Sequence, residues 1–239
     1  MKLRIFSFLT SLAFISIGVN AMDLDEDYYN IIKEKSFVSD SSENTSQGKL
    51  YFYYGPMGAG KSKLAIEKLN EFTEKGLKTY VYAPKPVNCD KISSRANMSA
   101  NTSKIELNDV EPNTYLIVDE AQFLSDEEIN TIKNICASKN VTALCFGLLT
   151  TFQLEMFEGS KKLVECADSV TKISMPCENC NENEAICNFR MSSNNKLIVL
   201  DKNQYKSLCE DCYKKFISYK INENLVTNFL QFNSSLICQ

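Results

Sequence analysis

The stretch Gly55-Pro-Met-Gly-Ala-Gly-Lys-Ser62 decides the fold of this 239-residue chain. It follows the apolar run Leu50–Tyr54, which is rich in β-favouring aromatic residues, and precedes Lys63–Phe72, whose apolar residues recur at helical spacing. A strand, the pattern G-x-x-x-x-G-K-S and a helix, in this order, are the context that a phosphate-binding P-loop requires. The alternative is a glycine-rich turn ahead of a surface helix.

The P-loop pattern carries a specific chemistry. Its glycines let backbone N–H groups turn toward phosphate oxygens, and the N-terminus of the following helix adds positive potential. Lys61 can reach the β and γ phosphates of ATP, and the Ser62 hydroxyl can ligate Mg²⁺. The residues predicted to bind the nucleotide are Gly55, Pro56, Met57, Gly58, Ala59, Gly60, Lys61 and Ser62.

An acidic pair ends the apolar run Tyr115–Val118. Because Asp119 directly follows a predicted buried strand, we expect it to hold Mg²⁺, directly or through water. Glu120 can accept a proton from an attacking hydroxyl, so it is the predicted general base. One alternative is a pair that only favours the dipole of the next helix. The Asp-Glu-Ala-Gln pattern also superficially resembles the Asp-Glu-Ala-Asp box of helicases, but the chain is too short for two helicase domains.

Further apolar runs alternate with helical patterns along the chain. Strands are expected at 78–83, 115–118 and 141–146, and a capping box formed by Ser125 and Glu128 marks the start of a helix. This alternation is typical of an α/β fold, here a P-loop NTPase-like parallel sheet flanked by helices. Residues 87–108 are polar and are expected to form a mobile loop.

Composition narrows the chemistry. The chain has 26 Lys and Arg against 30 Asp and Glu, and this net charge of −4 argues against nucleic acid as a partner. It contains no histidine, which excludes Ser-His and Cys-His nucleophilic pairs and histidine metal ligands. General-base catalysis therefore falls to a carboxylate.

Four of the ten cysteines form two C-x-x-C pairs, Cys177 with Cys180 and Cys209 with Cys212. Two such pairs supply four thiolates for a closed, structural Zn²⁺ site, and disulfides are the competing interpretation. The other cysteines fall into two groups. Small core residues are expected at Cys136, Cys145 and Cys166, and no role is assigned to Cys89, Cys187 and Cys238.

The N-terminal residues 1–21 have the pattern of a secretory signal, with Lys2 and Arg4 ahead of a short apolar run and a small-x-small cleavage site at Ala21. The alternatives are a buried helix, or an extension upstream of a true start at Met22. Residues 22–48 are acidic and then serine-rich, and are expected to form a flexible leader. No later stretch is apolar for the ~18 residues of a membrane span.

Taken together, the P-loop, the Val118-Asp-Glu-Ala-Gln-Phe123 segment and the paired C-x-x-C motifs resemble the thymidine kinase family of the zinc-lasso type. The similarity runs from about Leu50 to Phe216 and includes Gly147–Gln153 and Tyr205–Tyr213. It implies a kinase domain over 49–172, a zinc-binding lasso domain over 173–220 and a C-terminal tail over 221–239.

The resemblance also implies an activity and its partners. ATP and Mg²⁺ would bind the P-loop and Asp119, and Glu120 would take the proton from the 5′-hydroxyl of thymidine, in nucleoside salvage for DNA synthesis. A lasso at about 190–206 would cover the base, and the chain would form a homotetramer. The positions that match the family's nucleoside pocket are Met57, Phe123, Leu148, Phe152, Phe157, Asn188 and Tyr205.

Two features keep alternatives open. Leu200 and Asp201 replace the family's glycine pair in the lasso, and Asn188 stands where threonine is frequent. An export signal also conflicts with a need for ATP and reduced thiolates. A start at Met22, export into another ATP-containing compartment, or a kinase that has lost turnover would each resolve that conflict. A P-loop NTPase and a non-catalytic nucleotide-binding protein are the functional alternatives.

Overall fold

The computed structural model describes residues 26–36, 47–84, 90–94, 96–103, 105–191 and 204–220. Several sequence predictions lie outside these residues. They are the signal at 1–21, most of the lasso with Leu200 and Asp201, the tail at 221–239, and the thiols of Cys89 and Cys238.

A five-stranded parallel sheet forms the centre of the protein, with the strand order β2-β5-β6-β1-β7. The strands are β1 (Leu50–Tyr54), β2 (Thr79–Tyr82), β5 (Tyr115–Val118), β6 (Thr142–Gly147) and β7 (Ser169–Lys172). All pairings in this sheet are parallel, which confirms the α/β class predicted from the alternating pattern. The P-loop strand β1 is separated from β5, which ends at the acidic pair, by β6 alone.

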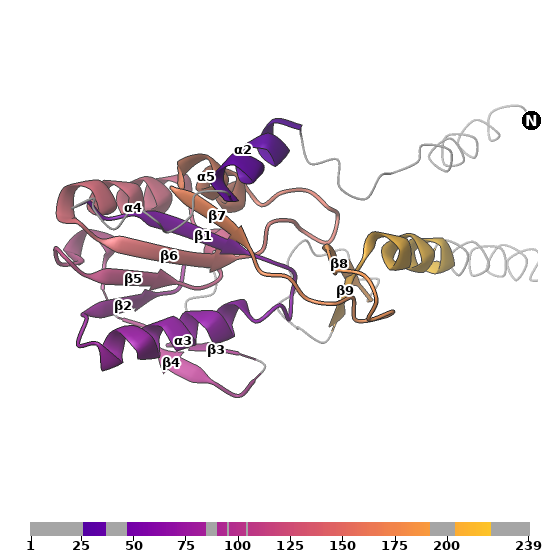
Figure 1. Ribbon diagram of the computed structural model, residues 1–239, viewed down its shortest axis with the longest axis horizontal. Coiled ribbons are helices and arrows are strands. Elements are labelled where there is room, and N and C mark those ends of the chain that lie inside the picture. Colours follow the sequence, from indigo (N-terminus) through magenta and orange to yellow (C-terminus); the bar gives the residue numbers. More distant parts are fainter. Residues whose placement is uncertain are drawn as a thin grey trace, which may run out of the picture.

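Helices cover both faces of the sheet (Figure 1). Helix α3 (Lys61–Glu74) lies on one face, and α4 (Asp126–Lys139) and α5 (Glu158–Cys166) lie on the other. Alternate strand residues supply the two cores: Phe52 and Val118 pack in the cluster that contains α4 and α5, whereas Ile117 and Phe146 pack with α3. This period of two follows from the pleat of the strands.

The start of α4 confirms the predicted capping box. The Ser125 hydroxyl accepts a hydrogen bond from the Glu128 N–H at 3.3 Å, and the Glu128 carboxylate accepts one from the Ser125 N–H at 2.8 Å. Two of the helix's unpaired N-terminal donors are satisfied in this way.

The leader at 22–48 requires a correction, because Glu26–Ser36 forms a helix, α2. Ile32 is buried against the sheet cluster, and Lys35 Nζ donates to the carbonyls of Val164 and Glu165, at 2.7 Å each. These carbonyls belong to the last turn of α5, where a cation is favoured. The acidic composition of the segment obscured the few apolar residues that anchor it.

The mobile loop expected at 87–108 is also wrong for the residues that the structure describes there. They include the antiparallel pair β3 (Lys91–Ser93) and β4 (Ser99–Asn101) and a 3-10 helix, η2 (Leu107–Asp109). Ile92 is 3% exposed and packs in the α3 cluster, and Met98 and Ala100 are partly buried against it, so a few apolar side chains attach a polar hairpin to the core. A single buried residue leaves too weak a periodicity for the sequence to reveal.

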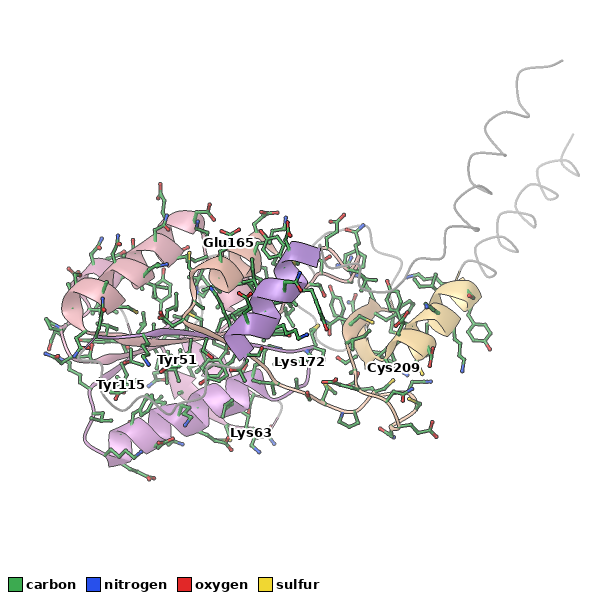
Figure 2. The ribbon with its side chains drawn as sticks, turned by 45° about the horizontal axis from the view of Figure 1, so that its top comes forward. Tyr51, Lys63, Tyr115, Glu165, Lys172 and Cys209 are labelled. Atoms are coloured by element: carbon green, nitrogen blue, oxygen red, sulfur yellow. The ribbon has the colours of Figure 1, made fainter. Side chains whose placement is uncertain are left out.

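A second, smaller unit follows the sheet. The strands β8 (Cys187–Arg190) and β9 (Tyr205–Leu208) pair antiparallel, and residues 210–220 are helical. This unit lies at one end of the molecule: Cys209 is at the opposite end from Tyr115 of β5 (Figure 2). Among the described residues, no helix has the length and apolar character that a membrane span needs.

Candidate functional site

The P-loop connects β1 to α3 through two glycines with left-handed backbone angles, Gly58 (φ 86°) and Gly60 (φ 88°). A Cβ atom at Gly60 would meet no atom within 4 Å, so the backbone angle, not space, requires glycine there. The Lys61 side chain is 9% exposed and folds along the loop, where its Nζ donates to the carbonyls of Gly55 at 2.9 Å and Pro56 at 2.8 Å. The loop thus has the backbone geometry of a phosphate site.

Asp119 emerges from the end of β5 next to the start of α3. Its side chain is 4% exposed. Burial, and then the neighbouring charge of Glu120, raise the pKa of its carboxyl to about 6, and the Ser62 side chain beside it partly opposes this rise. A hydroxyl and a carboxylate oxygen in contact are the hard ligands that Mg²⁺ prefers. The residues present therefore fit a magnesium ion bound by Ser62 and Asp119.

Glu120 is held in an unusual conformation. Its φ of 54° is left-handed, which a residue with a side chain rarely adopts and which clusters at functional sites. The amide of Gln122 donates to Glu120 Oε2 at 2.7 Å, and Gln122 Oε1 accepts from the Leu148 N–H at 2.9 Å. A Cβ atom at Gly147 would come within 2.9 Å of Gln122, so only glycine leaves room for this amide.

Gln122 was not among the predicted site residues. It lies two positions after Glu120, and the sequence signal that could have identified it is Gly147 at the end of β6. It is 3% exposed, and its amide connects the β6 edge to one oxygen of the Glu120 carboxylate.

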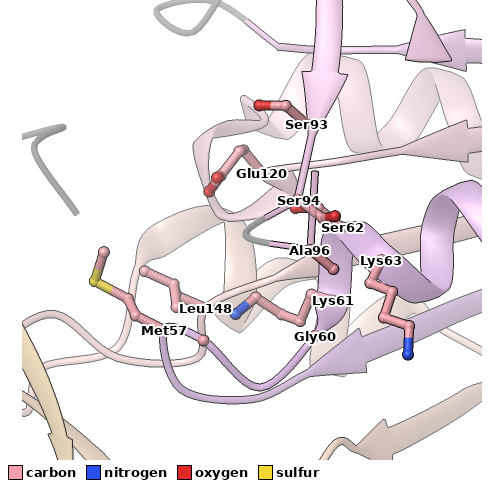
Figure 3. A pocket seen from close by; sticks show the side chains of 11 residues that line it. Met57, Gly60, Lys61, Ser62, Lys63, Ser93, Ser94, Ala96, Glu120 and Leu148 are labelled. Carbon is pink, nitrogen blue, oxygen red and sulfur yellow. The ribbon is translucent and has the colours of Figure 1, made fainter. Parts of the chain in front are cut away.

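A cavity of about 190 Å³ joins the P-loop to Glu120 (Figure 3). Lys61 points into it, whereas the side chain of Lys63 points the other way. Its walls come from the P-loop and the first turn of α3, from Glu120, from Leu148 directly after β6, and from the β3–β4 hairpin. The lining residues are Met57, Gly58, Gly60, Lys61, Ser62, Lys63, Ser93, Ser94, Ala96, Glu120 and Leu148. The three hairpin residues were missed because residues 87–108 were predicted to be a loop.

The structure brings only some of the predicted nucleoside-pocket residues together. Met57 and Leu148 line the cavity with Glu120. Phe123 and Phe157 pack edge to face, with ring centroids 5.7 Å apart. Asn188 is 4% exposed, and its Oδ1 accepts from the Met57 N–H at 2.8 Å.

Arg190 joins two further predicted residues. Its guanidinium lies 3.7 Å from the ring centroid of Phe152 and donates to the Tyr205 hydroxyl at 2.9 Å. Arg190 is 3% exposed, so this stack of a cation on an aromatic ring is largely shielded from water. Arg190 is the last residue of β8 and Tyr205 the first of β9, so this contact joins the two residues that flank the connection between the strands.

The four cysteines of the C-x-x-C motifs converge on one point. Their sulfur atoms all lie within 4.8 Å of one another, and the sulfurs of Cys180 and Cys209 are 3.8 Å apart. A tetrahedron of zinc–sulfur bonds of about 2.3 Å has edges of about 3.8 Å. Although burial raises the pKa of the Cys177 thiol, the backbone N–H groups around it prevail and lower that pKa to about 6. The four side chains therefore fit a tetrahedral Zn²⁺.

The eight described cysteines are all free, so they contain no disulfide. Cys136 and Cys145 are buried in the sheet cluster, and burial raises the pKa of the Cys136 thiol to about 12. These two act as small core residues, as predicted. Cys187, which had no predicted role, is buried beside the cysteine cluster and donates to the Leu208 carbonyl at 3.3 Å.

The fold and this site define a class: a P-loop NTPase-like protein with an acidic pair facing the loop and a four-cysteine unit appended to the sheet. Comparison with known families narrows the class. Residues 48–213 match the family model described as Thymidine kinase. The chain therefore belongs to the thymidine kinase family.

Individual relatives agree with the family model. A thymidine kinase of Rhodopirellula baltica is 30% identical over 74% of this chain and 93% of its own length. The thymidine kinase of Zymomonas mobilis is 33% identical over 63% and 84%, and that of Haemophilus influenzae is 35% identical over 54% and 74%.

Similarity to solved structures is weaker. The RuvB Holliday junction branch migration motor of Thermotoga maritima superposes with a TM-score of 0.34 at 14% identity, over 64% of this chain and 45% of that one. A point mutant of the same RuvB gives a TM-score of 0.31 at 16% identity, over 52% and 38%.

We predict one Zn²⁺ per chain, bound by Cys177, Cys180, Cys209 and Cys212, because their sulfurs already have the spacing of a tetrahedral site. Metal analysis of the purified protein checks the stoichiometry. Cys177→Ser should lose the zinc while the sheet domain, which has its own core, stays folded. Cys166→Ser, outside the cluster, is the control. Absence of zinc, with these four cysteines found in disulfides by mass spectrometry, would contradict the prediction.

We also predict that Asp119 destabilises the metal-free protein at neutral pH. Its pKa of about 6 in the fold exceeds its ordinary 3.8, so the folded state binds the proton more tightly. The resulting stabilisation is complete below about pH 4 and is lost as pH rises through 6. Asp119→Asn should therefore be more stable than the wild type at pH 7.5, by about 1–3 kcal/mol, and should lose this advantage at pH 4.

Denaturant unfolding without Mg²⁺ at the two pH values measures this difference. Asp109→Asn, at an exposed position, is the matched control and should show no pH-dependent gain. An equal effect of Asp119→Asn at both pH values would show that the Asp119 carboxyl does not titrate between them.

Proposed function

We propose that this protein transfers the γ-phosphoryl group of ATP to the 5′-hydroxyl of thymidine, in a reaction that requires Mg²⁺. The observation that carries the proposal is that Glu120 lines the same cavity as Lys61 and Ser62 of the P-loop. Membership of the thymidine kinase family supports thymidine as the acceptor. In this role the protein supplies dTMP by nucleoside salvage.

The P-loop residues position the nucleotide in this mechanism. The backbone N–H groups of the loop and Lys61 bind the phosphates, and Lys61 then exchanges its bonds to the Gly55 and Pro56 carbonyls for phosphate oxygens. Ser62 and Asp119 would hold Mg²⁺, which supplies charge neutralisation during the transfer. Most of the catalysis is then orientation and electrostatic stabilisation.

Glu120 is the general base in this mechanism. The chain contains no histidine, and a nucleoside hydroxyl is a poor nucleophile until its proton is accepted. The hydrogen bond from Gln122 holds one carboxylate oxygen of Glu120 and directs the other toward the cavity. Gln122 is thus a positioning residue for the base.

The proposed nucleoside pocket lies beside Glu120. Met57 and Leu148 give the cavity an apolar wall beside Glu120, which suits a methylated pyrimidine. Phe123, Phe152, Phe157 and Tyr205 are proposed to complete the pocket, and the zinc-bound unit to carry the lasso over the base. A homotetramer, also proposed from the family resemblance, is testable by analytical ultracentrifugation.

We predict that residues 22–239 phosphorylate thymidine or deoxyuridine with ATP and Mg²⁺. An assay against all common nucleosides, with product identified by mass spectrometry, measures the activity directly. ATP hydrolysis without a phosphorylated nucleoside would instead indicate an NTPase. Nucleoside binding without turnover would indicate a binding protein derived from a kinase.

Glu120→Gln should lower kcat by about 10²–10⁴-fold, since it preserves shape but cannot accept the proton. The dissociation constant of ATP should stay nearly unchanged, because Glu120 is outside the phosphate-binding loop. Lys61→Ala should damage both nucleotide binding and turnover, and Glu127→Gln, at an exposed position on α4, is the matched control. Near-normal turnover of Glu120→Gln would show that another group carries the proton.

A further inference from the structure

The cysteine-bound unit, which consists of β8, β9, the helical residues 210–220 and the four-cysteine cluster, contacts the P-loop. Two of its residues hydrogen-bond to the backbone of a single P-loop residue, Met57. Asn188 Oδ1 accepts from the Met57 N–H at 2.8 Å, and the Ser207 hydroxyl donates to the Met57 carbonyl at 2.5 Å. Asn188 of β8 and Ser207 of β9 are directly paired across their ladder, so both bonds come from one place on the small sheet. The donor and the acceptor of Met57 are therefore both bound by the second unit.

The two side chains that make these bonds are buried. Asn188 is 4% exposed and Ser207 is 1% exposed. In such a setting a hydrogen bond is electrostatically stronger than in water, and removal of one partner leaves a buried polar group unsatisfied. The contact is thus a firm attachment and not a passing surface interaction.

The attachment continues to the cysteine cluster. Glu178, inside the first C-x-x-C motif, accepts from the Ser207 N–H at 2.7 Å, and its own N–H donates to the Ser207 carbonyl at 2.9 Å. Ser207 stands two residues before Cys209 of the second motif. A continuous series of hydrogen bonds therefore runs from the cysteine cluster through Ser207 to Met57.

Met57 lies at a conformationally free part of the P-loop. It precedes Gly58, whose backbone angle of 86° is left-handed, and glycine offers the chain many alternative conformations. A P-loop binds phosphate through N–H groups that all point inward, so a rotated Met57 peptide would misdirect its neighbours. Because Met57 is already fixed, less conformational entropy is lost in ordering the loop when the nucleotide binds.

We propose that Asn188 and Ser207 are positioning residues for the P-loop, through which the cysteine-bound unit sets the affinity for ATP. This gives Asn188 a role toward the nucleotide in place of the nucleoside base. The inference rests on the proposed function only in taking ATP as the ligand of the loop.

The test measures ATP and thymidine separately in Asn188→Ala, Ser207→Ala and the double variant. A fluorescent ATP analogue, titrated into the zinc-loaded full chain, gives the dissociation constant, and steady-state assays give KM for each substrate. Each single variant should weaken ATP binding about 3–10-fold, the range that corresponds to one lost hydrogen bond. The KM for thymidine should change less than the dissociation constant of ATP, because the two residues bind the backbone of Met57 and not its side chain, which lines the proposed nucleoside pocket. Because both residues act through Met57, the double variant should lose less than the product of the single effects.

Matched controls distinguish an effect on the position of the P-loop from a general loss of folding or of zinc. Asn183→Ala makes the same change at an exposed position of the same unit and should leave both substrates unaffected. Zinc content and the unfolding midpoint are measured for every variant. If Asn188→Ala does not fold, Ser207→Ala, which removes a single hydroxyl, decides the matter.

Two outcomes would overturn the inference. A rise in the KM for thymidine with unchanged ATP affinity would place Asn188 at the base, and multiplicative effects in the double variant would show that the two residues act independently. Failure of the wild type to phosphorylate any nucleoside, with ATP binding still weakened in the variants, would refute the proposed function and leave this inference standing.

Discussion

The rest of the site depends on the burial of the Asp119 carboxylate beside Ser62, which brings the P-loop and the acidic pair together. Ser62 is the last residue of the P-loop motif and lies in the first turn of α3, whereas Asp119 directly follows β5, two strands from β1 in the sheet. Parallel pairing brings both carboxyl ends to one edge. The cost of burying a carboxylate there is visible in its raised pKa, and groups with strongly shifted pKa values cluster at functional sites.

A second constraint is the size of the appended unit. Its apolar cluster consists mainly of cysteines with Phe189 and Leu208, far less than the two clusters of the sheet domain. A core this small does not stabilise a fold without help, and the four cysteine sulfurs lie at a spacing that fits a zinc ion, whose binding would supply the missing stability. Through Asn188 and Ser207 this unit hydrogen-bonds to Met57, which connects the four-cysteine cluster to the P-loop.

The sequence patterns did not predict two elements that only a few buried side chains hold against the core. The helix Glu26–Ser36 is anchored by Ile32 and by Lys35, and the hairpin after β2 by Ile92. One buried side chain in a polar segment gives no periodicity, so both segments were predicted to lack regular structure. Gln122 escaped notice for a different reason: its partners, Glu120 and the Leu148 N–H, meet it only after β5 and β6 pair.

The sequence by itself determined the P-loop, the acidic pair, the parallel α/β class and the four zinc-spaced cysteines. Each of these follows from local chemistry: glycines that permit φ above zero, apolar runs of strand length, and pairs of thiols with two residues between them. Only the tertiary structure decided which side chains share a cavity with Lys61, that Gln122 orients Glu120, and that Asn188 contacts the P-loop backbone. Those contacts join residues far apart in the chain, such as Met57 and Asn188, and their existence depends on how the sheet and the cysteine-bound unit pack together.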